Sequence, residues 1–400
     1  MSTWFYRSQQ FAMSLSQPLQ RRFQPTTISG ANSVLRIPTI LQQHHVERVL
    51  VVTTPGFIRR KSLDPLFNAL TAAGVNYAYF ADVKPDPDIA CIEACLQAAT
   101  NQRAQALIAV GGGSVMDCAK VTGARLVRPR QSIQSMTGTM KIHRPLPLLI
   151  AVPTTAGSGS EVSAGAVITD TQTHRKYPID DLFLIPKVAI LDPQLLTGLP
   201  AKMTAYSGMD TLTHAIEAYT NKFGSRSARE HASHAVSLVF GYLRATYQDP
   251  SNLVARERML IASHDAGIAF SSAYVGYVHA ISHGIGGRYH VPHGLANAVI
   301  LPVVMAAFGD SVVPALAALG RTIGLTATDD AQCAHQFMAA VDRLRADLDL
   351  PDHLSQIQEA DIPALAAGAA AEGNPQYPVP QIWDSTKFAT VIDRVRLGKR

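Results

Sequence analysis

Residues 106–120 read ALIAVGGGSVMDCAK, an apolar run that passes directly into three glycines and then into a helical pattern. Without Cβ atoms, Gly111, Gly112 and Gly113 let backbone N–H groups approach an anion at a helix N-terminus, where the helix dipole also favours negative charge. A tight strand-to-helix turn is the plainer explanation, but three consecutive glycines cost more chain entropy than a turn requires. The stretch therefore predicts a phosphate-binding loop from Gly111 to Ser114, although it is not the G-x-G-x-x-G fingerprint of ordinary Rossmann folds.

Short apolar runs alternate with amphipathic stretches around this loop. RVLVV begins at Arg48, VNYAYF at Val75 and ALIAV at Ala106, and a helical pattern follows each of them. This βαβα order predicts a parallel sheet with helices on both faces.

The β-branched runs stop after VAILDP at Val188 to Pro193, and a helical pattern begins near Leu199. We therefore expect a domain boundary near residue 196. The predicted parts are an N-terminal extension over 1–22, an α/β domain over 23–196 and an all-helical domain over 197–400.

A second loop of small residues follows the next predicted strand. It reads PTTAGSGSE from Pro153 to Glu161. Parallel sheets bind ligands at the carboxyl ends of their strands, and the hydroxyls of Thr154, Thr155 and Ser158 can hydrogen-bond a ribose, a phosphate or a carboxamide there. The two loops together predict a nucleotide site.

Histidines gather in the second half of the chain. Asp210 and His214 are four residues apart, as are His279 and His283, and His293 follows Pro292. A lone histidine in an apolar helix is usually a core residue with a hydrogen-bond partner, but this grouping favours a divalent first-row metal. Asp210, His214, His279 and His293 form a full ligand set for such an ion, and this set suits iron or zinc.

Composition excludes several classes of protein. The 400 residues carry a formal net charge of +5, with basic residues scattered along the chain, so nucleic-acid binding has little support. Residues 266–287 and 291–309 lack charged side chains over the length of a membrane span. Both stretches contain serine, histidine or proline, so we expect buried central helices and no membrane partner. The charged fraction of 16% favours a homodimer or larger homo-oligomer.

The cysteines and the N-terminus bear on location. Four cysteines without a paired framework favour a reducing compartment, the cytoplasm. Residues 1–46 contain no Asp or Glu, which faintly resembles an organelle transit peptide. We expect instead a surface extension packed on the first domain.

Four motifs make the chain resemble the iron-containing, or group III, alcohol dehydrogenases: GGGSVMDCAK, PTTAGSGSE, DTLTHAIEAY and VHAISHGIGGRYHVPHG. The resemblance runs from about Phe23 to the last helices. It implies an N-terminal Rossmann-like α/β domain that binds a dinucleotide and an all-α C-terminal domain that binds a metal, with the active site in the cleft between them. This is also the dehydroquinate synthase-like fold.

The resemblance also implies roles for individual residues. It makes Asp210, His214, His279 and His293 the metal ligands, places His283 beside the substrate and the nicotinamide, has Gly111, Gly112, Gly113, Ser114 and Asp117 hold the pyrophosphate, and lines the nicotinamide side with Thr154, Thr155, Ser158 and Lys176.

One departure concerns the cofactor. Many relatives have an acidic residue just after the first strand, where it can hydrogen-bond the adenosine ribose, whereas this chain reads VVTTPG over 51–56. No carboxylate there would repel a 2′-phosphate, and Arg59, Arg60 and Lys61 are close by in the sequence. We therefore expect NAD or NADP as the cofactor, and the habit of the family favours NAD.

The expected activity is an oxidoreductase reaction on CH–OH groups. A metal-dependent alcohol dehydrogenase or aldehyde reductase would transfer hydride between NAD(P) and a small primary alcohol or aldehyde, with Fe²⁺, or Zn²⁺ in its place, as the Lewis acid. His283 would carry the proton or would only position the nicotinamide ring. The alternatives are a glycerol-dehydrogenase-like enzyme, a dehydroquinate-synthase-like enzyme, or a catalytically silent protein that binds nucleotide and metal.

Overall fold

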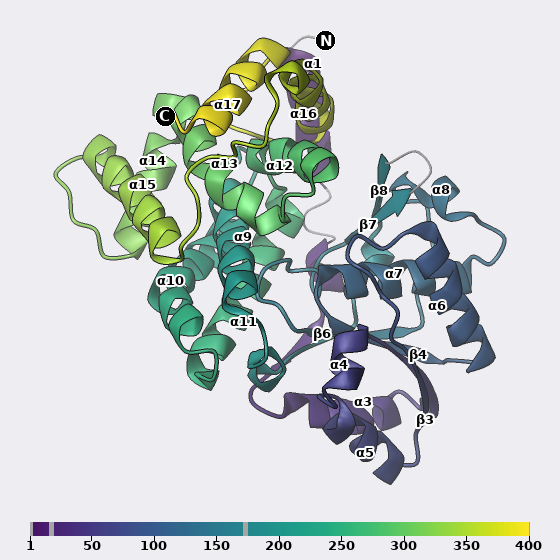
Figure 1. Ribbon diagram of the computed structural model, residues 1–400. Coiled ribbons are helices and arrows are strands. Elements are labelled where there is room, and N and C mark those ends of the chain that lie inside the picture. Colours follow the sequence, from purple (N-terminus) through teal and green to yellow (C-terminus); the bar gives the residue numbers. More distant parts are fainter. Residues whose placement is uncertain (1–2, 16–19, 171–174, 400) are drawn as a thin grey trace. The chain divides into compact units, whose positions relative to one another are not determined.

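The computed structural model describes residues 3–15, 20–170 and 175–399. The chain divides into two compact units (Figure 1). An α/β unit spans Gln20–Leu199, and a helical unit combines Pro200–Arg400 with the N-terminal segment Met1–Leu19.

The α/β unit is built on a six-stranded parallel sheet with the order β1-β9-β6-β4-β2-β3. Its strands are β1 (Thr26–Ser29), β2 (Arg48–Val52), β3 (Asn76–Phe80), β4 (Ala106–Gly111), β6 (Leu148–Pro153) and β9 (Val188–Leu191). β4 lies at the centre, where its last residue, Gly111, is in register with Pro153 of β6. The two predicted loops therefore leave neighbouring strands at the same edge of the sheet.

Alternate residues of the strands enter two separate cores. Leu50 and Val52 of β2 belong to one core and Val49 and Val51 to the other, since successive side chains of a strand point to opposite faces. Helices cover both faces (Figure 1). On one face lie α6 (Ile89–Asn101) and α7 (Gly113–Val127), and on the other α3 (Ile37–Gln43), α4 (Pro55–Arg59) and α5 (Asp64–Ala72). The predicted α/β class is confirmed.

A small second sheet in the same unit was not predicted. It has the order β5-β8-β7, formed by β5 (Gly138–Thr139), β8 (Arg175–Asp180) and β7 (Gly165–Asp170), with β7 and β8 antiparallel. The fully buried Lys120 of α7 donates its ammonium hydrogens to the Ser163 carbonyl at 2.9 Å, the Ser163 hydroxyl at 3.1 Å and the Gly165 carbonyl at 2.8 Å. Lys120 thus ties α7 to the start of β7. The short helices α8 (Ile133–Met136), η1 (Arg21–Phe23), η2 (Ser33–Arg36), η3 (Leu182–Leu184) and η4 (Pro193–Leu196) complete the described elements of this unit.

After Leu199 all the regular structure described is helical. The elements are α9 (Ala201–Thr220), α10 (Arg226–Gln248), α11 (Leu253–Ala273), α12 (Tyr277–Tyr289), α13 (His293–Phe308), η5 (Gly309–Val312), α14 (Val313–Thr322), α15 (Asp330–Asp347), η6 (Glu359–Asp361), α16 (Ile362–Gln376) and α17 (Ser385–Leu397). The all-α prediction for this part of the fold is confirmed.

Two of these helices form the centre of the helical unit. α9 packs against α10, α11 and α13, and α13 also packs against α12 and α17. By length and composition alone the segment His293–Thr322 could cross a membrane. In this unit most of α13 is buried against its neighbours, as the charge-free stretch over 291–309 predicts.

The N-terminal helix α1 (Thr3–Ser14) packs on α16 of the helical unit, so the expectation that it packs on the first domain was wrong. The Gln10 side chain amide donates at 2.8 Å to the carbonyl oxygens of Asn374 and Tyr377, and the Arg7 guanidinium donates to the Pro380 carbonyl at 3.2 Å. These hydrogen bonds hold α1 against the C-terminal end of α16. These contacts could not be predicted from the sequence, because nothing in the sequence distinguishes a buried, hydrogen-bonded glutamine from an exposed one.

Candidate metal centre and nucleotide loops

The predicted metal ligands come from three helices and meet in the helical unit. Asp210 and His214 lie one turn apart on α9, His279 is in α12, and His293 is the first residue of α13. The Asp210 Oδ1 atom lies 3.5 Å from His293 Nε2 and 3.9 Å from His279 Nε2. His214 Nδ1 also lies 3.9 Å from this oxygen.

Three of the four side chains form a tight group. Ligand atoms of Asp210, His279 and His293 all lie within 4.8 Å of one another. His214 lies at the edge of this group, where its ring stacks on those of His279 and Phe270, each with a centroid distance of 4.5 Å. The structure thus brings Asp210, His279 and His293 together, and the fourth predicted ligand, His214, lies beside them with its ring stacked on His279.

Asn297 lies at the point toward which the three ligand atoms are directed. Its amide nitrogen donates to Asp210 Oδ1 at 2.7 Å and lies 3.3 Å from His279 Nε2 and 3.1 Å from His293 Nε2. Its Oδ1 atom is buried without a hydrogen-bond partner among the described residues. A carboxylate oxygen and imidazole nitrogens that converge on one point fit a divalent first-row metal.

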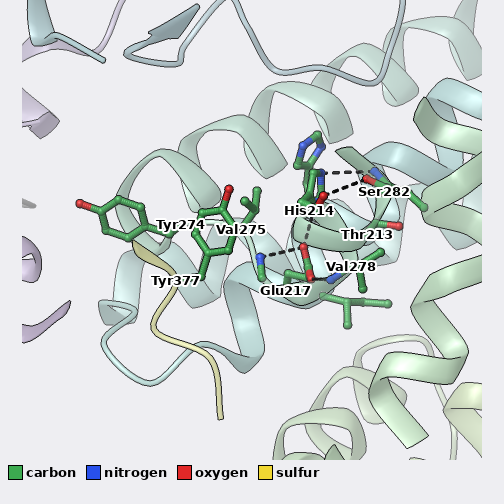
Figure 2. Close-up of polar contacts among 12 residues, drawn as sticks. Thr213, His214, Glu217, Tyr274, Val275, Val278, Ser282 and Tyr377 are labelled. Atoms are coloured by element: carbon green, nitrogen blue, oxygen red, sulfur yellow. Dashed lines mark hydrogen bonds and ion pairs between the residues drawn. The ribbon is translucent and has the colours of Figure 1, made fainter. Parts of the chain in front are cut away.

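A buried carboxylate orients His279. Glu217 of α9 is 1% exposed, and its Oε2 atom lies 2.5 Å from His279 Nδ1. The same carboxylate accepts from the backbone N–H groups of Gly276 at 2.9 Å and Val278 at 2.7 Å (Figure 2). A Cβ atom at Gly276 would lie 2.7 Å from Glu217 Oε1, so a larger residue there would displace the carboxylate from its hydrogen bond with Val278. Histidines that bind metals through one nitrogen commonly donate the other to a carboxylate, and here Nε2 is the nitrogen left for a metal.

Glu217 was missing from the predicted site, although the sequence holds a signal for it. It lies seven residues after Asp210 and three after His214, so all three share one face of α9. Burial of this helix face in the unit raises the pKa of the Glu217 carboxyl to about 8, and the three N–H donors around it lower the pKa.

Burial also shifts the ligands themselves toward their uncharged forms. It raises the pKa of Asp210, against the lowering effect of His293 and of the hydrogen bond from Asn297. It lowers the pKa of His279 well below the ordinary value, and the neighbouring His214 lowers it further. A neutral imidazole is the form that binds a metal, and a divalent cation would offset the cost of a buried, ionised Asp210.

His283 lies beside this centre. Its ring stacks on that of His293 with a centroid distance of 5.3 Å and an angle of 19° between the planes. Its Nδ1 atom lies 2.7 Å from Glu372 Oε1 of α16, a contact that the sequence analysis did not predict.

The three glycines of the predicted phosphate loop each face a different side chain of the α/β unit. A Cβ atom at Gly111 would lie 2.4 Å from Val115, one at Gly112 would lie 3.2 Å from the Thr155 hydroxyl, and one at Gly113 would lie 3.2 Å from Ser158. Gly112 is the N-cap residue of α7. The two predicted loops therefore lie next to each other at the start of α7, a 15-residue helix. The glycines place no side chain between the loops. This arrangement fits a phosphate group.

The remaining predicted cofactor residues are placed as follows. Thr154 is buried, and its N–H donates to the Gly111 carbonyl at 3.0 Å. The Ser114 hydroxyl accepts from the N–H of Asp86 at 3.3 Å. The backbone of Lys176 lies in β8, but its side chain lies outside the described residues.

Asp117 makes hydrogen bonds within the α/β unit. Its Oδ1 accepts from the Ser160 hydroxyl at 3.1 Å and its Oδ2 from the N–H of Val167 at 3.1 Å. The carboxylate thus connects α7 to the second loop and to β7. Its predicted role at the pyrophosphate stays a prediction.

The fold and the site together define a class: an α/β unit with a glycine loop suited to a nucleotide phosphate, and a helical unit with a centre suited to a metal. The model of the iron-containing alcohol dehydrogenase family matches residues 25–193. The model of the C-terminal part of the Fe-containing alcohol dehydrogenases matches residues 204–385.

Individual relatives agree with these matches. A 1,3-propanediol dehydrogenase of Klebsiella pneumoniae is 37% identical over 354 residues, which cover 86% of this chain and 90% of that protein. The crystal structure of a 1,3-propanediol oxidoreductase has a TM-score of 0.90 at 34% identity and covers 93% of this chain and 98% of that chain. The structure of a sulfoacetaldehyde reductase from Bifidobacterium kashiwanohense in complex with NAD⁺ has a TM-score of 0.84 at 28% identity, covering 93% and 97% of the two chains.

The chain belongs to the iron-containing alcohol dehydrogenase family, and it is an enzyme, an oxidoreductase of that family. The resemblance carried by the four sequence motifs is thereby confirmed. The description of the family implies a metal, and the group of Asp210, His279 and His293 could hold one.

Proposed function

We propose that the protein interconverts a small primary alcohol and its aldehyde, with Fe²⁺ at the Asp210 centre and NAD as the hydride carrier. The observation that carries the proposal is the convergence of Asp210, His279 and His293 within 4.8 Å in a family of alcohol dehydrogenases. When bound, the metal would supply Lewis-acid polarisation of the substrate oxygen, and the nicotinamide would supply or accept the hydride.

The residues of the chain would hold and orient these groups. Asp210, His214, His279 and His293 would bind the metal, and Glu217 would hold the tautomer of His279. The loop from Gly111 to Ser114 would bind the pyrophosphate through backbone N–H groups. Thr155 and Ser158 face this loop and would line the nicotinamide side together with Thr154 and Lys176.

His283 is proposed as the residue that moves the proton at the substrate oxygen. It stacks on His293 and is one-third exposed, so its ring is close to the centre and can exchange a proton with solvent. Replacement by Phe would test this role, because loss of kcat at unchanged metal content is expected for a proton carrier.

NAD is the proposed cofactor, and NADP remains chemically admissible. A structural relative was solved with NAD⁺. In this chain Thr54 follows β2 and is the N-cap residue of α4, and residues 51–56 contain no acidic side chain. A threonine neither binds the ribose hydroxyls as a carboxylate does nor repels a 2′-phosphate.

We further propose a homodimer or larger homo-oligomer in the cytoplasm. The low charged fraction of 16% supports association, and the four free cysteines support a reducing compartment. The described part of the chain contains no disulfide.

The test is anaerobic reduction of C2 to C4 aldehydes, including 3-hydroxypropanal, by the Fe²⁺-loaded protein with NADH and NADPH in parallel. Metal-dependent oxidation of NADH, absent in Asp210→Ala, is the expected result. No oxidation by protein with a measured full complement of iron would contradict the proposal. It would favour a dehydroquinate-synthase-like enzyme or a catalytically silent protein that binds nucleotide and metal.

A further inference from the structure

A chain of hydrogen bonds leads from His283 to the N-terminal helix. Glu372 Oε1 lies 2.7 Å from His283 Nδ1, and the Tyr377 hydroxyl donates to the same oxygen at 2.7 Å. An ionised carboxylate can only accept, so His283 offers Nδ1–H to it. In a neutral ring this leaves Nε2 as the acceptor nitrogen, and it restricts rotation of the ring.

The backbone that carries Tyr377 is fixed from both sides. Its N–H donates to the Gly373 carbonyl at 2.9 Å, which closes the last turn of α16. The buried Gln10 of α1 donates to the carbonyl oxygens of both Asn374 and Tyr377 at 2.8 Å. The Asn374 side chain in turn accepts from the Tyr277 hydroxyl and donates to the Trp383 carbonyl at 3.0 Å.

We propose that Glu372 is a positioning residue for His283, oriented by Tyr377 and supported by Gln10 of the N-terminal helix. The inference rests on the proposed function only in that His283 takes part in the reaction. The orientation of the ring is a property of the helical unit, which contains all four residues.

A histidine beside a metal centre needs a hydrogen-bond partner that selects its tautomer and orientation. An imidazole without a fixed partner exchanges between two tautomers and rotates about its side-chain bonds, so only a fraction of the molecules presents the productive nitrogen. Glu372 is about one-third exposed, as is His283, and a single exposed hydrogen bond contributes little. The hydrogen bond from the hydroxyl of the buried Tyr377 adds a second restraint on the carboxylate.

The first test reads the tautomer directly and needs no turnover. Protein labelled with ¹⁵N-histidine and loaded with diamagnetic Zn²⁺ is examined by long-range ¹H–¹⁵N correlation, and His283 is assigned by its absence in His283→Gln. The Nδ1–H tautomer is expected in the wild type and in Glu372→Gln, whose amide oxygen can still accept. Glu372→Ala should give a mixture of tautomers. An unchanged tautomer in Glu372→Ala overturns the proposal.

The second test separates positioning from general stability. Glu372→Ala should lower kcat about 10- to 100-fold, with KM for the aldehyde and the metal content unchanged, and Glu372→Gln should restore most of the rate. Glu230→Gln, at an exposed glutamate on α10, is the matched control. An unchanged kcat in Glu372→Ala, in a preparation whose wild type turns over, overturns the positioning role.

Tyr377→Phe supplies a variant with minimal change in volume. A loss of kcat of a few-fold is expected in the wild-type background and none in the Glu372→Ala background, because the hydroxyl acts through Glu372. Tyr247→Phe is the control, because the Tyr247 hydroxyl also donates to a carboxylate, that of the exposed Asp349. Additive effects of the two substitutions contradict the proposed order of contacts. A wild type that oxidises no NADH would refute the proposed function, while the tautomer experiment would still decide the role of Glu372.

Discussion

At the scale of single residues, Glu217 contacts the candidate metal centre without being a proposed ligand. Its two oxygens accept from His279 and from the N–H groups of Gly276 and Val278. In Glu217→Gln one oxygen becomes an NH₂ group, which faces an N–H donor and cannot accept from it. We expect metal affinity to fall about 10- to 100-fold, measured by competition with a chelator, and Glu230→Gln to show wild-type affinity. Equal affinities would mean that His279 is oriented by packing alone.

A second prediction at the scale of single residues concerns Thr54 and the choice between NADH and NADPH. Thr54→Asp would place a carboxylate beyond the end of β2, where it would repel a 2′-phosphate. The ratio of kcat/KM for NADH to that for NADPH should rise by about tenfold or more, which corresponds to roughly 1.4 kcal/mol. Thr71→Asp on the exposed face of α5 controls for added negative charge and should leave the ratio unchanged.

Lys120 gives the stability of the α/β unit a pH dependence. Burial lowers its pKa from 10.5 to about 8, so the unfolded chain binds more protons than the folded one between these values. The free energy of unfolding should therefore rise with pH from about 8 to 10.5, by an amount on the order of 3 kcal/mol. Denaturant unfolding of the wild type and of Lys120→Met would be compared, because the variant lacks this titration. Parallel pH profiles for the two would show that Lys120 titrates normally.

At the scale of elements, the start of α7 carries the next prediction. A methyl group at Gly112 would lie 3.2 Å from Thr155 and enter the space between the two loops. Gly112→Ala should weaken NADH binding at least tenfold, as measured by nicotinamide fluorescence, with little change in the thermal unfolding temperature. Gly198→Ala, where an added Cβ meets no atom within 4 Å, should bind NADH normally.

Elements with a local pattern could be predicted from the sequence, and those set by long-range packing could not. The strands ending at Gly111 and Pro153 and the Asp210–His214 pair on α9 depend on spacing within a few residues. Glu372 lies 89 residues from His283, and no periodicity connects them. The small sheet of β5, β8 and β7 was missed because β5 has only two residues and β8, Arg175–Asp180, has no continuous apolar run. The contacts of Lys120 and Asp117 that hold β7 to α7 come from residues far away in the sequence.

At the scale of the whole molecule, metal and nucleotide should stabilise different units. The four proposed ligands all belong to the helical unit, and the glycine loop belongs to the α/β unit. A metal at 100 times its dissociation constant adds about 2.7 kcal/mol to the free energy of unfolding of the unit that binds it. Calorimetry should show a higher unfolding temperature with Zn²⁺ and a lower one with chelator, and Asp210→Ala should abolish the difference. A shift that persists in Asp210→Ala would place the metal elsewhere.

The docking of α1 on α16 has a consequence for synthesis on the ribosome. The first helix of the chain is complete some 350 residues before its partner, a delay of roughly 20–70 s at common elongation rates. During that time the face with Gln10 has no acceptor, and Trp4 and Phe11, which stay largely exposed even in the folded unit, are open to other chains. In the helical unit α1 can therefore dock only after α16 has been synthesised. A fusion partner placed before Thr3 would be present during the whole interval between the synthesis of α1 and that of α16.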